Sequence, residues 1–471
     1  MTRLPVLLVA ACFVACSGPV SQSAVPQAPV FGSMQAANDA NMAAGTTHIK
    51  YVIVMVQENR TFDNFFYGFP GANYAKTGYG HGKLYTMQPI ALKWKFPLNH
   101  SHSQFLEDYD SGQNDGFDAM ISGWVHGCND YRNHPACWVY YPEKSVKQMA
   151  FSYVKQTQIQ PYWTMAQQYV LGDNTFASNS GPTFPAHQYY IAGQSDHASE
   201  VPAGNPWGCD GPASNSVVKL IFGYSTPPHD FSKPTGHEVP GPFPCFTYKT
   251  IANLLDDAGV SWHYYVANPI DSSLNGFAAV KAIRYGPDWS KMETNTNIFN
   301  DIKNGALAQV SWVTPDPPDS DHPGPDTGSG GPDWVASVVN AVGESKYWNN
   351  SAIIVMWDDW GGWYDHVPPP QLADVQTHAY EGLGFRIPLI IVSPYAKPHH
   401  VTHQLNELAS SMTFIEKIFG LPSLGQADAR ANAFEDAFDF RQKPTPFTPI
   451  PTHLKAQYFI HHQVAGQVDE Q

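Results

Sequence analysis

Four nearly continuous runs of apolar and β-branched residues predict the strands of a buried sheet. The strongest run covers residues 49–56, and similar runs cover 308–313, 352–357 and 389–392. Strands buried on both faces have this composition, whereas a strand with one face in water alternates apolar and polar positions. These segments therefore predict the centre of a mostly parallel sheet.

Helical patterns separate these strands at residues 250–257, 334–342 and 405–419. Strands that alternate with helices predict an α/β fold, in which a doubly wound, mostly parallel sheet carries helices on both faces. Loop insertions that are rich in Gly, Pro, His and Asp interrupt the pattern. They cover residues 67–100, 198–247 and 316–332. Loops of this length in a compact domain usually build a site or a lid.

The chain has 471 residues, 43% of them hydrophobic, which is enough for one large core. We expect a single domain over residues 47–445 and a C-terminal tail over 446–471. Residues 17–46 are rich in Ser, Ala, Gln and Pro, as a flexible tether would be.

The first 16 residues have the pattern of a secretory signal. Arg3 precedes an apolar run that ends at Ala15 and Cys16 and is too short to span a bilayer. Simple cleavage and a lipoprotein signal, with lipid on Cys16, are the two interpretations. Either predicts an exported bacterial protein that is periplasmic, lipid-anchored or secreted.

Four further cysteines are available for disulfides in an exported protein. The shortest loops come from the pairs Cys128–Cys137 and Cys209–Cys245, which we therefore predict. No Cys and His spacing indicates a structural zinc site.

The formal net charge is -15, from 41 acidic and 26 basic residues. A nucleic-acid partner would need a basic surface, so we expect none. An anionic substrate stays compatible with this charge, because a bound cation can reverse the local field.

Polar pairs follow the two strongest strands. Glu58 and Asn59 come after the run at 49–56, and Asp358 and Asp359 come after the run at 352–357. The carboxyl ends of parallel strands form the edge where ligands bind. Three carboxylates and an amide oxygen at that edge predict a divalent cation site for Ca, Mg, Mn or Zn. One pair alone would favour helix capping, and two pairs favour the metal site.

Histidines and hydroxyls supply further candidates. Several of the 20 histidines lie in loop-like stretches, where they could donate hydrogen bonds or a proton. These are His100, His102, His187, His322 and His366. Ser180 and Thr183 lie just before a predicted helix at 186–191, as helix caps or as a nucleophile. Spacing does not choose between these two.

Ordered motifs along residues 48–440 resemble a family of bacterial phosphoesterases. The motifs are Glu58-Asn59-Arg60-Thr61-Phe62-Asp63, His100 with Asp115-Gly116-Phe117, Gly181-Pro182-Thr183, Asp321-His322-Pro323, Asp358-Asp359 with Gly361-Gly362, Tyr364-Asp365-His366-Val367-Pro368-Pro369, and Ser411-Met412-Thr413-Phe414-Ile415-Glu416 with Gly420-Leu421-Pro422. The family includes non-haemolytic phospholipases C and a respiratory-burst-inhibiting acid phosphatase.

The resemblance implies an alkaline-phosphatase-like fold and roles for named residues. It implies metal ligands at Glu58, Asn59, Asp358 and Asp359. It also implies that Thr183 is the nucleophile, with His100 and His322 against the phosphoryl group and His263 as a weaker candidate for that contact.

The residues after Thr183 distinguish two branches of the family. This chain has Ala186-His187-Gln188 where phospholipases typically carry Asn-Arg, so it is more similar to the acid-phosphatase branch. We therefore predict metal-dependent hydrolysis of phosphomonoesters through a phosphothreonine intermediate. The alternative is a phospholipase C or phosphodiesterase that cleaves phospholipid head groups. The expected partner is a phosphorylated small molecule or such a head group.

Two other classes are disfavoured. A sulfatase needs a Cys or Ser followed by Pro and Arg in a fixed frame, and residues 183–187 lack both the Cys or Ser and the Arg. A secreted, non-enzymatic binding module would explain the 13 Trp and 24 Tyr, but it has no use for a cluster of acidic ligands.

Overall fold

The computed structural model describes residues 31–94, 97–120, 148–202, 206–212, 216–222, 236–270, 273–324, 327–370, 372 and 382–464. The predicted Cys128–Cys137 pair, the signal segment at 1–16 and most of the tether lie outside these residues. The predicted Cys209–Cys245 disulfide is present.

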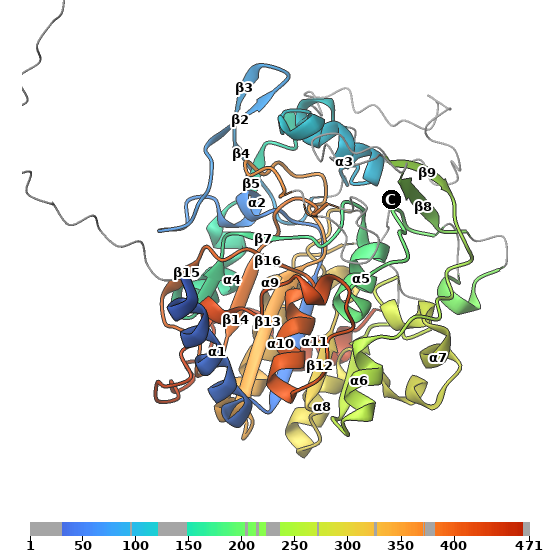
Figure 1. The fold of residues 1–471 in the computed structure, drawn as a ribbon. Helices are drawn as coiled ribbons and strands as arrows, with labels where there is room; N and C mark the ends of the chain where they lie inside the picture. Colours follow the sequence, from blue (N-terminus) through green and yellow to red (C-terminus); the bar gives the residue numbers. More distant parts are fainter. Residues whose placement is uncertain are drawn as a thin grey trace, which may run out of the picture.

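An eight-stranded mixed sheet forms the middle layer (Figure 1). Its centre is β1 (Tyr51–Gln57), which pairs in parallel with β12 (Val310–Val313) and β13 (Ser351–Trp357). The rest of the sheet comprises β10 (Trp262–Val266) and β11 (Met292–Thr294) beyond β12, and β14 (Leu389–Val392), β6 (Val170–Gly172) and β15 (His400–Thr402) beyond β13. Only β14 runs antiparallel to its neighbours in this sheet. The predicted mostly parallel sheet is confirmed, and all four predicted strands belong to it.

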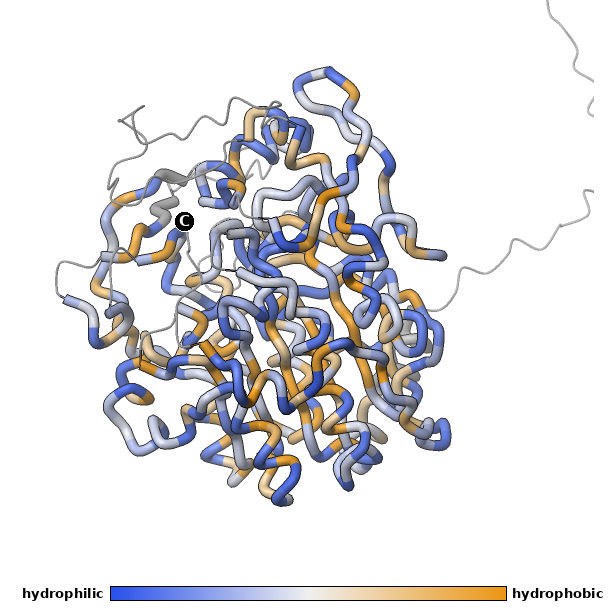
Figure 2. Tube along the Cα trace, turned by 180° about the vertical axis from the view of Figure 1, so that it is seen from behind, coloured by the Kyte–Doolittle hydropathy of each residue, from blue (hydrophilic) through white to orange (hydrophobic). Residues whose placement is uncertain are grey.

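The apolar residues of β1 are buried on both faces, as expected for a strand at the centre of the sheet. Residues 52–56 are at most 1% exposed, and every residue of β13 is buried. In Figure 2 the apolar positions concentrate along the strands inside the molecule. The register pairs Gln57 with Trp357, so the two strands end level and deliver Glu58 beside Asp358.

Helices cover both faces of the sheet. In Figure 1, α1 (Phe31–His48), α6 (Ile251–Asp257) and α10 (Ser410–Phe419) lie in front of it, and α5 (Thr183–Ala192) packs on α6 and α10. Behind it, α4 (Gln160–Gln168) packs on α9 (Gly331–Gly343), which also contacts α8 (Asn297–Asn304) and α11 (Ala456–His462).

The prediction of a helix from residue 405 is wrong at its start. Residues Asn406–Glu407 form the short strand β16, which pairs with β7 (Thr175–Phe176). The Ser410 hydroxyl accepts a hydrogen bond from the Glu407 backbone N–H, so the helix begins at Ser410. A tertiary strand pairing here overrides the local helical pattern.

The predicted insertions carry small elements of their own above the carboxyl edge of the sheet (Figure 1). Those within the predicted bounds are the hairpin of β2 (Thr77–Gly80) and β3 (Lys83–Thr86), the strand β4 (Gln88–Ile90), and the hairpin of β8 (Val218–Phe222) and β9 (Gly236–Pro240). Three elements outside those bounds lie beside them, namely α2 (Phe62–Phe66), α3 (His102–Tyr109) and β5 (Ser152–Val154), which pairs with β4.

Folded segments extend beyond the expected domain bounds at both ends. Within the expected tether, α1 buries Met42, and its Asn41 side chain donates a hydrogen bond to the Phe438 carbonyl at 2.9 Å. Within the expected tail, Phe459 of α11 is 1% exposed and packs edge-on against Trp334. None of the helices in the described residues is long and apolar enough to cross a membrane.

A buried guanidinium ties together the segments that follow β1 and β13. Arg386 is fully buried and donates hydrogen bonds to Asp365 at 3.0 Å and to Asp63 at 3.2 Å. It also donates to the backbone carbonyls of Asn73 and Asp173, at 2.9 and 2.6 Å. This cluster anchors the loops that carry the candidate site.

Removing this charge should destabilise the fold strongly. Arg386→Met leaves two buried carboxylates without their cation, so the free energy of unfolding should drop by at least about 3 kcal/mol. Urea denaturation followed by tryptophan fluorescence measures this. Arg441→Met is the matched control, because Arg441 forms an exposed ion pair with Asp439 and should change stability little. Equal effects of the two substitutions would contradict the anchoring role.

A second buried acidic pair, Asp316 and Asp319, follows β12. Burial, and then the neighbouring charge of Asp316, raise the pKa of Asp319 well above that of an ordinary carboxyl group. Burial also raises the pKa of Asp316. The folded protein therefore holds a proton here that the unfolded chain releases above about pH 4.

Stability should consequently fall as the pH rises from about 5 to about 8, because the folded state binds more protons than the unfolded state in this range. Asp319→Asn keeps the shape and a hydrogen-bond donor without the ionisable proton. Its free energy of unfolding should exceed that of the native protein by about 1 kcal/mol or more at pH 8 and differ little at pH 5. A less stable variant at pH 8 would show that the pair is ionised in the folded state.

Candidate active site

The two polar pairs that follow β1 and β13 meet at the carboxyl edge of the sheet. Glu58, Asn59, Asp358 and Asp359 are all fully buried. The Asn59 backbone N–H donates to Asp358 Oδ1 at 3.1 Å, and its side-chain Nδ2 donates to the Asp359 carboxylate at 3.2 Å. The four residues that the sequence nominated as metal ligands therefore lie together.

Local backbone geometry holds these pairs in place. Asn59 has a left-handed conformation with a φ of 57°, which Asn tolerates better than most residues. Gly361 is also left-handed, and a Cβ there would lie 2.3 Å from the Asn59 carbonyl oxygen. Its N–H donates to Asp359 Oδ1 at 2.7 Å. The glycine thus allows the Asp pair to turn back onto Asn59.

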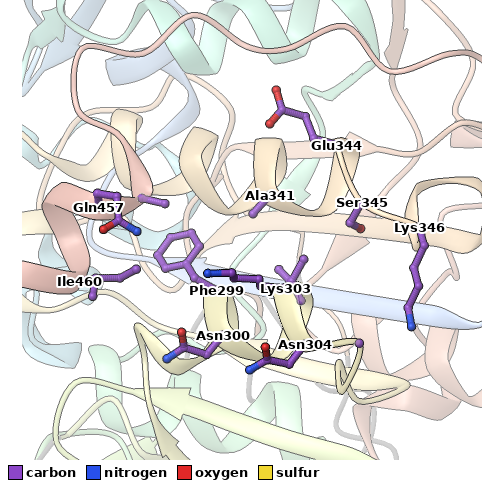
Figure 3. A pocket seen from close by; sticks show the side chains of 13 residues that line it. Phe299, Asn300, Lys303, Asn304, Ala341, Glu344, Ser345, Lys346, Gln457 and Ile460 are labelled. Atoms are coloured by element: carbon purple, nitrogen blue, oxygen red, sulfur yellow. The ribbon is translucent and has the colours of Figure 1, made fainter.

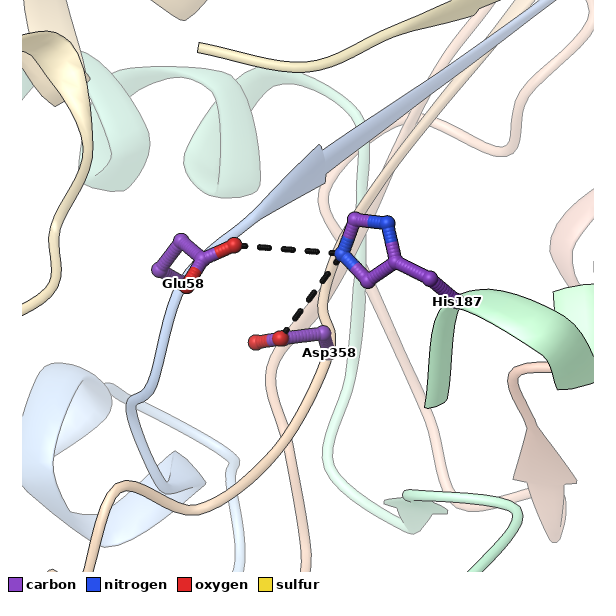
Figure 4. A group of neighbouring side chains, drawn as sticks. All are labelled: Glu58, His187 and Asp358. Carbon is purple, nitrogen blue, oxygen red and sulfur yellow. Dashed lines mark ion pairs between the residues drawn. The ribbon is translucent and has the colours of Figure 1, made fainter. Parts of the chain in front are cut away.

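His187 of α5 joins this cluster (Figure 4). Its Nε2 lies 3.8 Å from Glu58 Oε1 and 3.8 Å from Asp358 Oδ2. Its Nδ1 donates to the Leu274 carbonyl at 2.9 Å, and burial lowers the pKa of His187 to about 3. The lowered pKa favours the neutral ring, whose Nε2 lies on the side of the two carboxylates.

Thr183 is the first residue of α5 and is fully buried. Burial raises the pKa of Asp358 and Asp359, and for Asp358 the charge of Asp359 adds to this, while the adjacent Thr183 hydroxyl offsets part of the rise in both. The hydroxyl thus lies against the Asp pair at a helix N-terminus, where the helix dipole favours an anion. Ser180, the other hydroxyl candidate, instead pairs with His102 Nδ1 at 3.0 Å.

His100 and His322 line the same site with their rings 5.6 Å apart. Each ring donates its Nδ1–H to a backbone carbonyl, of Leu98 at 2.8 Å and of Pro323 at 2.6 Å. The Nε2 atoms therefore face inward. His100 Nε2 accepts from Asn59 Nδ2 at 2.9 Å, while His322 Nε2 is buried and has no hydrogen-bond partner among the described residues.

Arg60 and Asp321 form hydrogen bonds that hold the loop that carries His322. Arg60 is fully buried and donates its Nε–H to the Asp321 carbonyl at 2.8 Å. The Asp321 carboxylate accepts from Tyr162 at 2.7 Å and from Trp357 at 3.0 Å. This network fixes the loop that carries His322 to the end of β13.

The structure does not bring His263 to the cluster. His263 pairs in register with Ser311, which pairs with Ile53, five residues before Glu58. At about 3.3 Å per strand residue, this places His263 roughly 16 Å from the edge of the sheet. Its Nδ1 lies 3.6 Å from Asp301 of α8 instead. At that distance the His263 side chain does not reach the cluster, so the structure does not bring it to the phosphoryl contact that the resemblance implies.

The donor set fits a divalent cation. Ligand atoms of Glu58, His187 and Asp358 all lie within 4.8 Å of one another. The Asn59 Oδ1 atom is buried and has no hydrogen bond to the rest of the described chain, so it is free to act as a fourth ligand. A second group of possible ligands, Asp63, Asp365 and His366, differs because both of its carboxylates already pair with Arg386.

The sequence nominated His187 only as one of several loop histidines and assigned it no role here. The available signal was its spacing, since Thr183 and His187 are four residues apart and a helix puts such residues on one face. The helix was predicted to start at residue 186, which hid this relation.

A separate cavity of about 570 Å³ lies between α8, α9 and α11 (Figure 3). Its lining includes Phe299, Lys303, Ala341, Lys346 and Ile460, and none of the candidate site residues. The buried cluster at the sheet edge, rather than this cavity, therefore has the chemistry of an active site.

The chain belongs to the phosphoesterase family. Residues 49–422 match the family described as "Phosphoesterase family". This range includes every candidate residue of the cluster at the sheet edge, and the resemblance of the sequence motifs to bacterial phosphoesterases is confirmed.

Curated relatives include phospholipases C. The chain is 23% identical over 454 residues to phospholipase C A of Mycobacterium tuberculosis, covering 86% of this chain and 80% of that protein. It is 27% identical to non-hemolytic phospholipase C of Burkholderia pseudomallei, over 81% of this chain and 56% of that one. It is 25% identical to non-specific phospholipase C1 of Arabidopsis thaliana, over 85% and 73%. These relatives favour the phospholipase C alternative over the acid-phosphatase branch.

Among solved structures, the chain is similar to a protein in the alkaline phosphatase superfamily from Vibrio parahaemolyticus. The likeness has a TM-score of 0.34 and 10% identity, and covers 83% of this chain and 78% of that one. Family membership, rather than this likeness, carries the assignment to phosphoester hydrolysis.

Proposed function

We propose that this phosphoesterase hydrolyses phosphodiesters in the manner of a phospholipase C, releasing a phosphorylated head group from a lipid alcohol. The observation that carries the proposal is the buried Thr183 hydroxyl at the N-terminus of α5, beside the Asp358–Asp359 pair and the cation ligands. The relatives named phospholipase C support the diester substrate, because they match this chain over most of its length.

The residues have distinct roles in this scheme. Glu58, Asn59 and Asp358, with Asp359 beside them, would hold a divalent cation, which supplies positive charge to the nucleophile and the phosphoryl oxygens. Thr183 Oγ attacks phosphorus and forms a Thr–O–P bond as the bond to the lipid alcohol breaks. The threonine proton leaves with that alcohol. Water then cleaves the phosphothreonine, which frees the phosphorylated head group and restores the hydroxyl.

His100 and His322 would bind the phosphoryl oxygens. Because both Nδ1 atoms donate to backbone carbonyls, each ring can donate to the substrate only through a protonated Nε2. His322 Nε2 is open to the substrate, since it has no hydrogen-bond partner among the described residues, although burial lowers the pKa of this ring and opposes its protonation. For His100 to donate to the substrate, the hydrogen bond between its Nε2 and Asn59 must first break.

Thr183→Ala should lower kcat for the preferred ester by at least about 10³-fold, because no hydroxyl remains to attack phosphorus. Thr183→Ser keeps the hydroxyl and should retain much more activity. Steady-state kinetics at saturating metal measures both, with circular dichroism to show an intact fold. A well-folded Thr183→Ala protein with a tenth or more of native activity would exclude Thr183 as the nucleophile.

Substrate choice separates the diesterase from the phosphomonoesterase that remains the second candidate. His187 and Gln188, in place of an Asn-Arg pair, favour the second candidate. The purified protein should turn over p-nitrophenylphosphorylcholine with a kcat/KM at least about tenfold above that for p-nitrophenyl phosphate. The reverse ratio would identify a phosphomonoesterase, and activity on neither ester with any divalent metal would refute both candidates.

A further inference from the structure

We propose that His187 is a nitrogen ligand of the metal centre, so that the site selects a transition metal such as zinc over magnesium or calcium. This inference rests on the cation site of the proposed function and deepens it. The oxygen ligands predicted from the sequence are compatible with several divalent metals. A single imidazole ligand would narrow the choice of metal.

The position of His187 Nε2 is the first argument. This atom is buried, makes no hydrogen bond within the described chain, and lies 3.8 Å from both Glu58 Oε1 and Asp358 Oδ2. These separations are too long for hydrogen bonds. Ligands about 2.0 to 2.1 Å from a tetrahedral metal lie about 3.4 Å from one another. Small movements of these side chains would therefore bring all three ligand atoms within bonding distance of one metal ion.

The opposite nitrogen of the ring supplies the second argument. Nδ1 donates to the Leu274 carbonyl at 2.9 Å, with the Tyr190 hydroxyl 2.6 Å away. Tyr190 in turn pairs with the Tyr264 hydroxyl, which donates to the same carbonyl. A histidine that binds a metal usually donates its other N–H in this way, which fixes the ring and its lone pair.

Helix α5 explains how one element provides both a nucleophile and a ligand. Thr183 and His187 are separated by one helical turn, so they share the face that points at the Asp pair. Gly276 allows the neighbouring segment to approach, because a Cβ there would lie 2.7 Å from the His187 carbonyl oxygen. Gln188 Nε2 donates to the Gly276 carbonyl at 2.9 Å, which holds α5 in this orientation.

Ligand chemistry then decides the metal. Magnesium and calcium take oxygen ligands almost entirely, whereas imidazole suits zinc and its transition-metal neighbours. The His187 Nε2 atom beside the Glu58 and Asp358 carboxylates makes a mixed nitrogen and oxygen donor set. Zinc is therefore the ion that best matches Glu58, Asp358 and His187.

Metal binding tests this directly on the full-length protein after chelation. Competitive titration should show a zinc affinity far above that for magnesium or calcium. His187→Gln should lower the zinc affinity by at least about tenfold and alter the visible absorption of the cobalt-substituted site. His461→Gln, at an exposed histidine of α11, is the matched control and should change neither. Unchanged zinc affinity and cobalt spectrum in His187→Gln would overturn the proposal.

A second measurement keeps the proposal testable if His187→Gln does not fold. Zinc K-edge X-ray absorption of the unmodified protein should show an imidazole in the coordination shell, and an all-oxygen shell would overturn the assignment. Tyr190→Phe removes only the hydroxyl beside Nδ1 and should weaken zinc binding less than His187→Gln.

These metal measurements can also be made on Thr183→Ala, so they do not depend on turnover. If the native protein binds zinc through an imidazole but hydrolyses no phosphoester, His187 is supported as a ligand and the proposed function is refuted. If the native protein hydrolyses phosphoesters with calcium or magnesium held in an all-oxygen shell, the proposed function is supported and the His187 ligand is refuted.

Discussion

Buried negative charge at the carboxyl edge of β1 and β13 is the constraint on which the site depends. Glu58, Asp358 and Asp359 have no exposed surface, and no Lys or Arg forms an ion pair with either Asp in the part of the chain that the structure describes. An uncompensated buried carboxylate costs several kcal/mol. Burial raises the pKa of Asp358 and Asp359, and the charge of Asp359 adds to the rise at Asp358.

In a neighbouring cluster, the buried carboxylates pair with a cation that belongs to the chain. Asp63 and Asp365 follow the same two strands a few residues later, and Arg386 satisfies both with its own hydrogen bonds. The first cluster is a group that could hold a divalent cation from solution, whereas Arg386 supplies the cation of the second cluster. This difference distinguishes a candidate metal centre from a cluster that holds loops in place.

The sequence predicted those features that depend on local pattern. Runs of buried apolar residues identified the four central strands, and strand ends located both polar pairs. Features that depend on contacts between distant segments were missed. His187 acquires its orientation from Leu274, 87 residues away, and residues 406–407 form a strand only because Thr175 and Phe176 lie beside them. The separation of His263 from the cluster was also not evident from the sequence, since its level in the sheet is set by pairing with β12.

The Arg386 cluster also bears on how the chain reaches its native state during synthesis. β1 emerges early, but both of its partner strands begin after residue 300, and Arg386 is separated from Asp63 by 323 positions. Contacts of such long sequence separation make folding slow. The ribosome must therefore release most of the chain before the central strand is covered. A nascent chain stalled before residue 310 contains neither partner strand of β1 and would expose the apolar surface of that strand, which favours chaperone binding.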